Sequence, residues 1–419
     1  MSLLNFLPIA VTVIGGFLLI KLRAFFVFHP RAVVRELKGA LNTNGAVRSL
    51  CLALAGTLGV GNIIGVAVGL IVGGSGSIFW LAVSSIFALV LKYSEACISS
   101  DISGGDGGGM LLPLKRSFAR FGTPLSYAYA FLSLVLAFFM GGALQSVGAV
   151  GALSASTGIN IQYLSLIFAL SSGVILLFLK RSLKSLTVVI IPLITSIYIA
   201  LTLGVVMINF IKLPEIISQI FKSALDFKAM SGGAIGCVAT LSVREGFSRG
   251  LLSNEAGAGT SSFAHSEIPT TPTESGILGM CEVLFDTVIL CPLTGIAILS
   301  SVQNPSDFKS GADLVVAAFR LSLGSPLACI VSVCILLFAF STVVCWFYYG
   351  RVCAEYLHLS LIPYTVIFLS FLFFGSIIGE GFIVYVCDTV LLFLTTLTGA
   401  VLIKNSDRIK RLSELSGLL

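Results

Sequence analysis

Apolar runs, each about as long as a bilayer-spanning helix, follow one another along almost the whole chain. About 20 apolar residues suffice for a helix to cross a bilayer. Only 11% of the 419 residues are charged, whereas soluble domains carry about 25%. The sequence therefore predicts an all-α polytopic membrane protein, with one integral membrane domain over 1–419. The expected spans are eleven: 4–27, 47–71, 76–99, 124–152, 161–179, 186–211, 229–250, 276–301, 326–350, 361–379 and 382–403.

The positive residues give this set of spans an orientation. With eleven spans, 20 of the 25 Lys and Arg residues fall on the side of the C-terminus. Positive charge favours cytoplasmic loops, so we expect the N-terminus outside and the C-terminus in the cytoplasm. The net charge of +6 then reflects membrane orientation and not nucleic-acid binding. No charged segment precedes the first apolar run, so we expect a retained span and not a signal peptide.

The second expected span contains a glycine-rich interruption. Residues 56–62 read GTLGVGN within an otherwise apolar run. Glycine weakens a helix, and non-helical backbone at membrane depth is tolerated only where it is buried in protein or lines a cavity. Free amides there can hold an anion and free carbonyls a cation. The stretch predicts the substrate and ion site of a transporter. Close helix packing through small residues such as Gly61 and Gly65 is the alternative.

A second interrupted stretch lies about 180 residues further on, where 231–236 reads SGGAIG in the seventh expected span. Paired interruptions in corresponding halves are the best sequence pointer to a transporter site. They suggest two five-helix repeats of opposite topology, about 47–211 and 229–403, with the first span as an extra helix. The polar segment 244–267 that follows is interpreted as a structured cytoplasmic loop that forms part of an intracellular gate.

Several polar residues lie inside the expected spans, where they are costly and often functional. The amide of Gln145 suits an amino-acid ligand or an interhelical hydrogen bond. Ser341 and Thr342 suit a small hard cation, or they bond back to their own helix. Asp286 and Asp388 could bind a cation, relay a proton or pair with a basic residue.

Other residues have simpler interpretations. Trp346 lies one turn beyond Thr342 and either walls a pocket or packs. Lys92 and Glu95 are expected to pair on one helix face and reach the membrane interface. The ten cysteines lie in apolar runs without metal-ligand spacing, and no Ser-His-Asp arrangement is evident. We therefore expect no enzyme activity and no cofactor besides a coupling ion.

The sequence resembles the alanine/glycine:cation symporters, the sodium:alanine symporter family of the amino acid-polyamine-cation superfamily. This resemblance implies a leucine-transporter-like fold with a 5 + 5 inverted repeat, and symport of alanine or glycine with Na⁺ or H⁺. The similar motifs are GTLGVGNIIGVAVGLIVGGSGSIFW at 56–80, KYSE at 92–95, RGLLSNEAGAG at 249–259, FDTVILCPLTG at 285–295 and FAFSTVVCWFYYG at 338–350.

The resemblance also implies roles for individual residues. Gln145 matches the family's glutamine near the substrate, and Ser341 and Thr342 match the hydroxyl pair at the cation site. The expected substrate-binding residues are Thr57, Gly59, Gly61, Asn62, Gln145, Gly232, Gly233, Gly236 and Trp346. The expected cation-binding residues are Ala55, Gly56, Ser341 and Thr342.

Three departures from the family pattern bear on substrate and ion choice. Val60 replaces a threonine, GGGMLLPL stands at 107–114, and TPTESG stands at 271–276. The function expected is uptake of a small neutral amino acid, driven by Na⁺ or H⁺, by a monomer in a bacterial inner membrane. An amino-acid exchanger and a non-transporting amino-acid sensor on the same scaffold are the alternatives.

Overall fold

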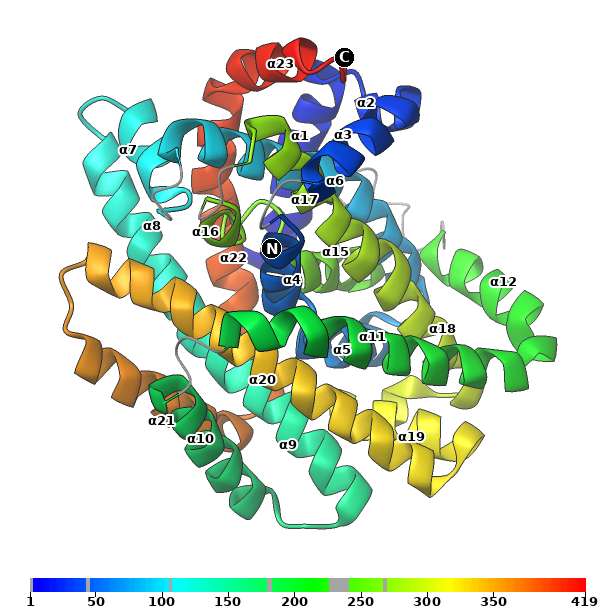
Figure 1. Cartoon of the computed structure of the whole chain (residues 1–419). Coiled ribbons are helices and arrows are strands. Elements are labelled where there is room, and N and C mark those ends of the chain that lie inside the picture. Colours follow the sequence, from blue (N-terminus) through cyan, green and yellow to red (C-terminus); the bar gives the residue numbers. More distant parts are fainter. Residues whose placement is uncertain (1–2, 43–45, 105–107, 179–182, 226–240, 267–269) are drawn as a thin grey trace.

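The computed structural model describes residues 3–42, 46–104, 108–178, 183–225, 241–266 and 270–419, which fold into helices without any strand (Figure 1). Within the described residues, seven helices are long and apolar enough to cross a membrane. This agrees with a polytopic membrane protein, while the count of eleven spans stays a prediction. The seven are Gly76–Ser103, Gly122–Thr157, Ile190–Ile208, Pro272–Ser301, Ser325–Tyr356, Leu361–Ile378 and Glu380–Lys404.

Some of these spans contain more than one helical element. Two of them contain π-helical turns, η3 and η5, which widen a helix locally and often mark functional sites. Three further apolar helices are shorter: Phe6–Lys21 (α1), Val60–Gly73 and Ile161–Leu177 within α10. The elements of the long spans are α6 (Gly76–Ser103), α8 (Gly122–Leu136), η3 (Ala137–Ala143), α9 (Leu144–Thr157), α10 (Ile161–Phe178), α11 (Leu183–Ile208), α17 (Pro272–Val283), η5 (Leu284–Leu290), α18 (Cys291–Ser301), α20 (Ser325–Tyr356), α21 (Leu361–Ile378) and α22 (Glu380–Lys404).

The second expected span is broken where its glycines predict a break. Helix α4 (Ala46–Thr57) ends at Thr57, and the backbone of Gly59 is extended, with φ −127° and ψ −161°. The short helix η2 (Val60–Asn62) then leads into α5 (Ile64–Gly73). Residues 55–67 are all buried. The break therefore lies inside the protein, where freed backbone groups can be satisfied without contacting lipid.

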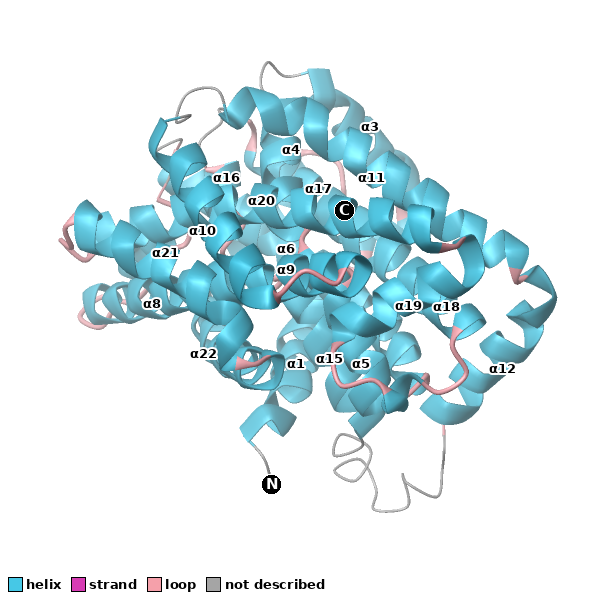
Figure 2. Ribbon diagram, turned by 90° about the horizontal axis from the view of Figure 1, so that it is seen from below, coloured by secondary structure: helices cyan, strands magenta, loops and turns pink. Residues whose placement is uncertain are grey.

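A second break lies between α15 (Leu241–Asn254) and α16 (Ser262–His265). Glu255, Gly257 and Gly259 have φ of 56°, 91° and 74° there, in the left-handed region that ends helices. The expectation that 244–267 forms a loop was wrong for 244–254, because these residues lie in α15, and residues 245–266 are buried. Helix α15 starts beside the end of α5, where the Ser242 hydroxyl donates to the Gly73 carbonyl at 2.6 Å (Figure 2).

The expected interruption at 231–236 lies outside the described residues. The break at 255–261 was not predicted, because the polar residues of this segment are typical of a loop. Helix η2 of the first break packs against both α15 and η5, and also against α9 and α20. The two breaks therefore lie close together in the middle of the helix assembly.

Two short amphipathic helices lie together at one end of the molecule. Figure 1 shows α3 (Pro30–Asn42) and α23 (Ser406–Leu415) together at one end. The Arg35 guanidinium joins them by donating to the Ser416 carbonyl at 2.9 Å. The other short helices are α2 (Phe25–Phe28), α7 (Leu111–Ser117), α12 (Leu213–Ala224) and α19 (Gly311–Leu323).

Two arginines do not lie where the charge count placed them. Arg244 and Arg249 were assigned to the cytoplasmic loop after the seventh span, yet both lie within α15. Arg249 is buried, and Arg244 lies near the end of α15 that contacts Gly73. The excess of Lys and Arg residues on the side of the C-terminus is therefore smaller than the count suggests, although that side still has more of them.

Candidate functional site

The hydroxyl of Thr342 links α20 to the first break. Its Oγ1 lies 3.0 Å from the Ala55 carbonyl oxygen and 3.5 Å from that of Leu58. The Gly59 amide bonds to the Thr57 carbonyl at 2.9 Å, so it does not continue the helix by bonding to Ala55. Carbonyls in the last turn of a helix lack intrahelical partners. Hydroxyl and carbonyl oxygens therefore converge at this point, as a small cation requires.

Ser341 does not join this group in the structure. Its hydroxyl donates to the Phe338 carbonyl of its own helix at 2.7 Å, which is the back-bonding alternative. The expected cation residues Ala55 and Gly56 are buried at the end of α4. A Cβ on Gly56 would lie 3.0 Å from the Cys345 Sγ and 3.2 Å from the Tyr349 Oη.

Gln145 faces the first break from α9. Its Oε1 accepts the Val60 amide at 3.1 Å, and its Nε2 donates to the Met140 carbonyl at 3.0 Å. A Cβ on Gly59 would lie 2.6 Å from the Thr342 Oγ1 and 3.1 Å from the Gln145 Oε1. Only glycine therefore lets these two polar side chains approach the break together.

The remaining expected residues of the first break have other partners. Asn62 donates from its Nδ2 to the Asp286 Oδ1 at 2.5 Å. The Thr57 hydroxyl bonds back to the Ala53 carbonyl at 3.3 Å. A Cβ on Gly61 would lie 3.1 Å from the Leu252 carbonyl oxygen. Gly61 thus allows the first break to contact the end of α15.

Trp346 connects α20 to the second break. Its indole donates to the Glu255 Oε1 at 3.2 Å, and the Thr260 hydroxyl donates to the Glu255 Oε2 at 2.5 Å. Both Trp346 and Glu255 are fully buried. Glu255 is a site residue that sequence reasoning missed. The signal was present as a glutamate followed by glycines at 257 and 259, but the segment was interpreted as a structured cytoplasmic loop.

Lys92 supports the second break in place of the expected pairing with Glu95. Its Nζ donates to the Asn254 carbonyl at 2.6 Å and lies 3.5 Å from the Glu282 Oε2. Glu282 also bonds to His265. Lys92 and Glu95 are both fully buried, so the expectation that they reach the interface was wrong. The Glu95 carboxylate faces the backbone amides of Gly257 and Gly259.

Asp388 has a basic partner, as one of its alternatives allowed. The Arg249 Nη2 lies 2.5 Å from the Asp388 Oδ2, and the Arg249 Nε lies 3.4 Å from the Glu245 Oε2. These side chains are almost completely buried. These ion pairs join α15 to α22. Asp388 is therefore paired with the guanidinium of Arg249.

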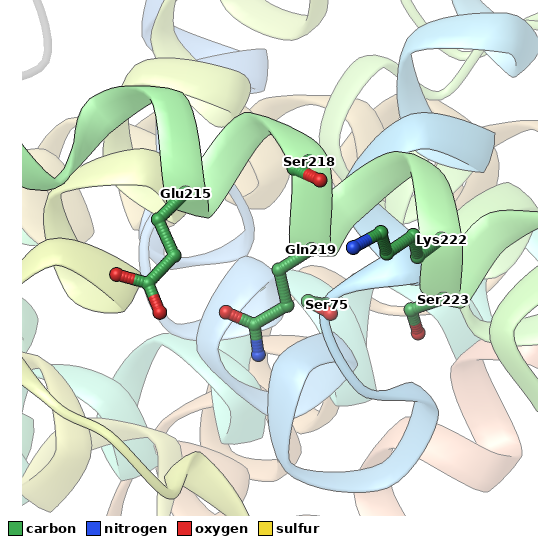
Figure 3. A pocket seen from close by; sticks show the side chains of 6 residues that line it. All are labelled: Ser75, Glu215, Ser218, Gln219, Lys222 and Ser223. Atoms are coloured by element: carbon green, nitrogen blue, oxygen red, sulfur yellow. The ribbon is translucent and has the colours of Figure 1, made fainter.

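The structure thus gathers most of the expected site residues around the first break, while Gly232, Gly233 and Gly236 lie outside the described residues. An open pocket of about 620 Å³ lies elsewhere, between α12 and the turn before α6. Figure 3 shows Glu215, Gln219 and Lys222 of α12 along it, with Ser75 opposite. None of the residues around the two breaks lines this pocket.

The chain is similar to a known protein family and to known transporters. The model of the sodium:alanine symporter family matches residues 2–411. An uncharacterized transporter of Haemophilus influenzae is 31% identical over 84% of this chain and 79% of its own length. The sodium/alanine symporter AgcS of Methanococcus maripaludis is 30% identical over 85% of this chain and 79% of its own length.

A solved structure has a similar fold. The manganese transporter of Eremococcus coleocola superposes with a TM-score of 0.52 at 17% identity, over 84% of this chain and 75% of that one. At that identity the likeness concerns the fold alone. Among the described residues here, no group of three or more His, Cys, Asp or Glu side chains is placed to hold a metal ion.

Proposed function

The chain belongs to the sodium:alanine symporter family, and on that premise we propose that it couples uptake of a small neutral amino acid, alanine or glycine, to inward flow of Na⁺. One observation carries the proposal. Two broken helices meet in the buried core, with Gln145 and Thr342 both directed at the first break. Broken helices that expose backbone groups are the binding elements of many secondary transporters.

The coupling cation would bind where Thr342 meets the end of α4. The Thr342 hydroxyl and the carbonyls of Ala55 and Leu58 already converge there. The negative end of the α4 dipole adds to the attraction for a cation. Ser341 would join this site only after its hydroxyl leaves the Phe338 carbonyl.

The amino acid would bind between the two breaks. Its carboxylate would bind at the start of η2 beside Gln145, where it would displace the Gln145 Oε1 from the Val60 amide, since the start of a helix favours an anion. Its ammonium would lie toward Glu255 and the carbonyls of the second break. Trp346, which already bonds to Glu255, would form one wall and limit the size of the side chain.

Transport would follow from rocking of one helix bundle against the other around these breaks. The proposal includes two inverted five-helix repeats, about eleven spans, a monomer, and an outside N-terminus in a bacterial inner membrane. Coupling is a free-energy linkage, so Na⁺ and the amino acid should each tighten binding of the other. Coupling to H⁺ is the second candidate, because Asp286 is a buried carboxylate near the first break.

Equilibrium binding of labelled L-alanine to the purified protein tests the proposal. Binding should tighten when Na⁺ replaces a large inert cation. The Gln145→Ala change should weaken alanine binding by about tenfold or more, because it removes the amide that would hydrogen-bond to the carboxylate of alanine beside the first break, and a hydrogen bond to a charged group contributes about 1.5–3 kcal/mol. Gln162→Ala, on an exposed helix surface, is the matched control. An affinity for alanine that changes neither with Na⁺ nor in Gln145→Ala would contradict the proposed site.

A further inference from the structure

The two short helices that follow α1 carry apolar side chains at the surface. The chain leaves α1 through Arg23 and Ala24, whose φ of 53° and 44° lie in the left-handed region that residues other than glycine rarely adopt. This turn leads into α2 and then α3, which Figure 1 shows at the outer edge of the end that also holds α23. Only residues 22–29 separate α1 from α3. Both short helices therefore lie close to the membrane surface at which the first expected span ends.

Helix α3 packs on the protein through one of its faces. Ala40 and Leu278 of α17 form a small buried cluster, and Leu37 and Leu50 of α4 pack against it. Leu37 and Ala40 are three residues apart, as residues on one face of a helix are. The protein therefore covers this face of α3, and the opposite side of the helix points away from the protein.

The exposed side of α3 carries an apolar strip. Val34 is 49% exposed and Leu41 is 39% exposed. They are seven residues apart, which is about two helical turns, so they lie in one row along the helix. In the adjoining α2, Val27 and Phe28 are 59% and 72% exposed. Exposed apolar side chains that cluster in this way mark a contact with a membrane or with another molecule.

Two cations lie beside this strip. Arg31 precedes Val34 by three residues and Lys38 follows it by four, so both neighbour it on the helix surface. Both are exposed, and neither has a carboxylate partner among the described residues. Glu36, the only acidic residue of α3, is half-buried and interacts electrostatically with Arg35. The exposed side of α3 therefore carries positive charge that the described part of the protein does not neutralise.

We propose that α2 and α3 lie on the membrane surface and recognise the headgroups of anionic phospholipids. The lipid-facing surface consists of Val27, Phe28, Arg31, Val34, Lys38 and Leu41. A helix with an apolar strip beside Lys and Arg lies in the plane of the interface, with the strip at the boundary of the acyl chains. Anionic headgroups attract basic residues at this depth, so Arg31 and Lys38 favour them over zwitterionic headgroups. The contact is the same whether or not the protein carries alanine.

A second copy of the chain fits this surface less well than the bilayer does. A symmetric dimer places the same patch of both chains together. Arg31 and Lys38 of one copy would then approach Arg31 and Lys38 of the other, and like charges at close range repel. An anionic bilayer neutralises the same residues. Charge complementarity therefore selects the bilayer as the occupant.

Fluorescence quenching by bromine-labelled lipids in proteoliposomes tests the proposal. Phe28→Trp adds an indole to the lipid-facing surface, and its emission is obtained by subtracting that of the unsubstituted protein, which has two tryptophans. Brominated phosphatidylglycerol and brominated phosphatidylcholine are compared at the same minor mole fraction in phosphatidylcholine vesicles. The anionic lipid should quench the added indole at least about twofold more strongly, because each nearby Lys or Arg attracts it. High salt should reduce the difference by screening these charges.

Matched variants in the Phe28→Trp background identify the residues that set this preference. Arg31→Gln together with Lys38→Gln should make the two lipids quench equally, because these changes remove both exposed cations. Lys309→Gln removes an exposed cation just before α19 and should keep the preference. Circular dichroism and gel filtration would establish that each variant is folded. If the double variant does not fold, the salt dependence of the preference gives the answer.

Two results would overturn the proposal. Equal quenching by the two lipids while Arg31 and Lys38 are intact would show a membrane contact without headgroup recognition. Absence of quenching by either lipid would place Phe28 in water or, if the protein elutes as a dimer, against a second copy. Alanine uptake plays no part in this measurement, so failure of the transport proposal remains distinguishable.

Discussion

At the scale of single residues, Gly59 is the position where the site tolerates least change. An added Cβ would lie 2.6 Å from the Thr342 Oγ1 and would push that hydroxyl away from the Ala55 carbonyl. We predict that Gly59→Ala lowers Na⁺-dependent alanine uptake by about tenfold or more, since overpacking costs about 1–3 kcal/mol. The initial rate of uptake at several Na⁺ concentrations would measure the effect.

Gly381→Ala provides the matched control for this prediction. No heavy atom lies within 4 Å of the position that its Cβ would take, so uptake and expression should stay near wild type. Equal uptake by Gly59→Ala and Gly381→Ala would mean that Thr342 and Gln145 do not act at the first break.

Gln145, Thr342 and Trp346 could be found from the sequence because each is polar or bulky within an apolar run. Their family match strengthened that choice. Asp286 was noticed as well, but its role could not be decided, because the choice between pairing and ion binding depends on neighbours distant in sequence. Asn62 and Asp286, for example, are 224 residues apart in the chain.

At the scale of helices, the break at 56–62 could be predicted, whereas the break at 255–261 was not. Glycines within an apolar run, as at 56–61, leave a clear signal. The break at 255–261 follows Asn254 and begins with Glu255. Because such polar residues are typical of loops, the sequence did not indicate a buried break there. These residues are buried because Lys92, Thr260 and Trp346 bond to them. Such compensation between distant helices cannot be read from one stretch of sequence.

The buried pair between α15 and α22 should matter for stability. We predict that Arg249→Met lowers the free energy of unfolding by about 3–5 kcal/mol, because it leaves the buried carboxylate of Asp388 uncompensated. The midpoint of thermal unfolding in detergent would fall accordingly. Arg351→Met removes the exposed pair with Glu355, whose atoms lie 2.7 Å apart, and should cost less than about 1 kcal/mol.

The same experiment distinguishes the roles of the two intramembrane aspartates. If Arg249→Met were as stable as Arg351→Met, the Arg249–Asp388 pair would not be a structural tie between α15 and α22. Asp388 would then return as a candidate for ion or proton binding. The result has no bearing on Asp286, which has no basic partner among the described residues.

At the scale of the whole molecule, the all-helical membrane class and the family could be predicted from the sequence. Long apolar helices, a helical fold and the family are all present. The positions of the buried arginines were not predictable, because a charge count assigns a residue to the nearer loop. The arrangement itself, with α20 and α11 packed beside α4 (Figure 1), depends on contacts between distant segments of the chain.

Uptake of labelled L-alanine and glycine into proteoliposomes tests the central proposal most directly. The purified protein would face an inward Na⁺ gradient, a pH gradient alone, or no gradient. The proposal of two broken helices around a cation-linked site predicts accumulation above equilibrium with the Na⁺ gradient only. Accumulation with the pH gradient only would contradict coupling to Na⁺. Saturable alanine binding without accumulation under any gradient would contradict symport and favour the exchanger or the sensor.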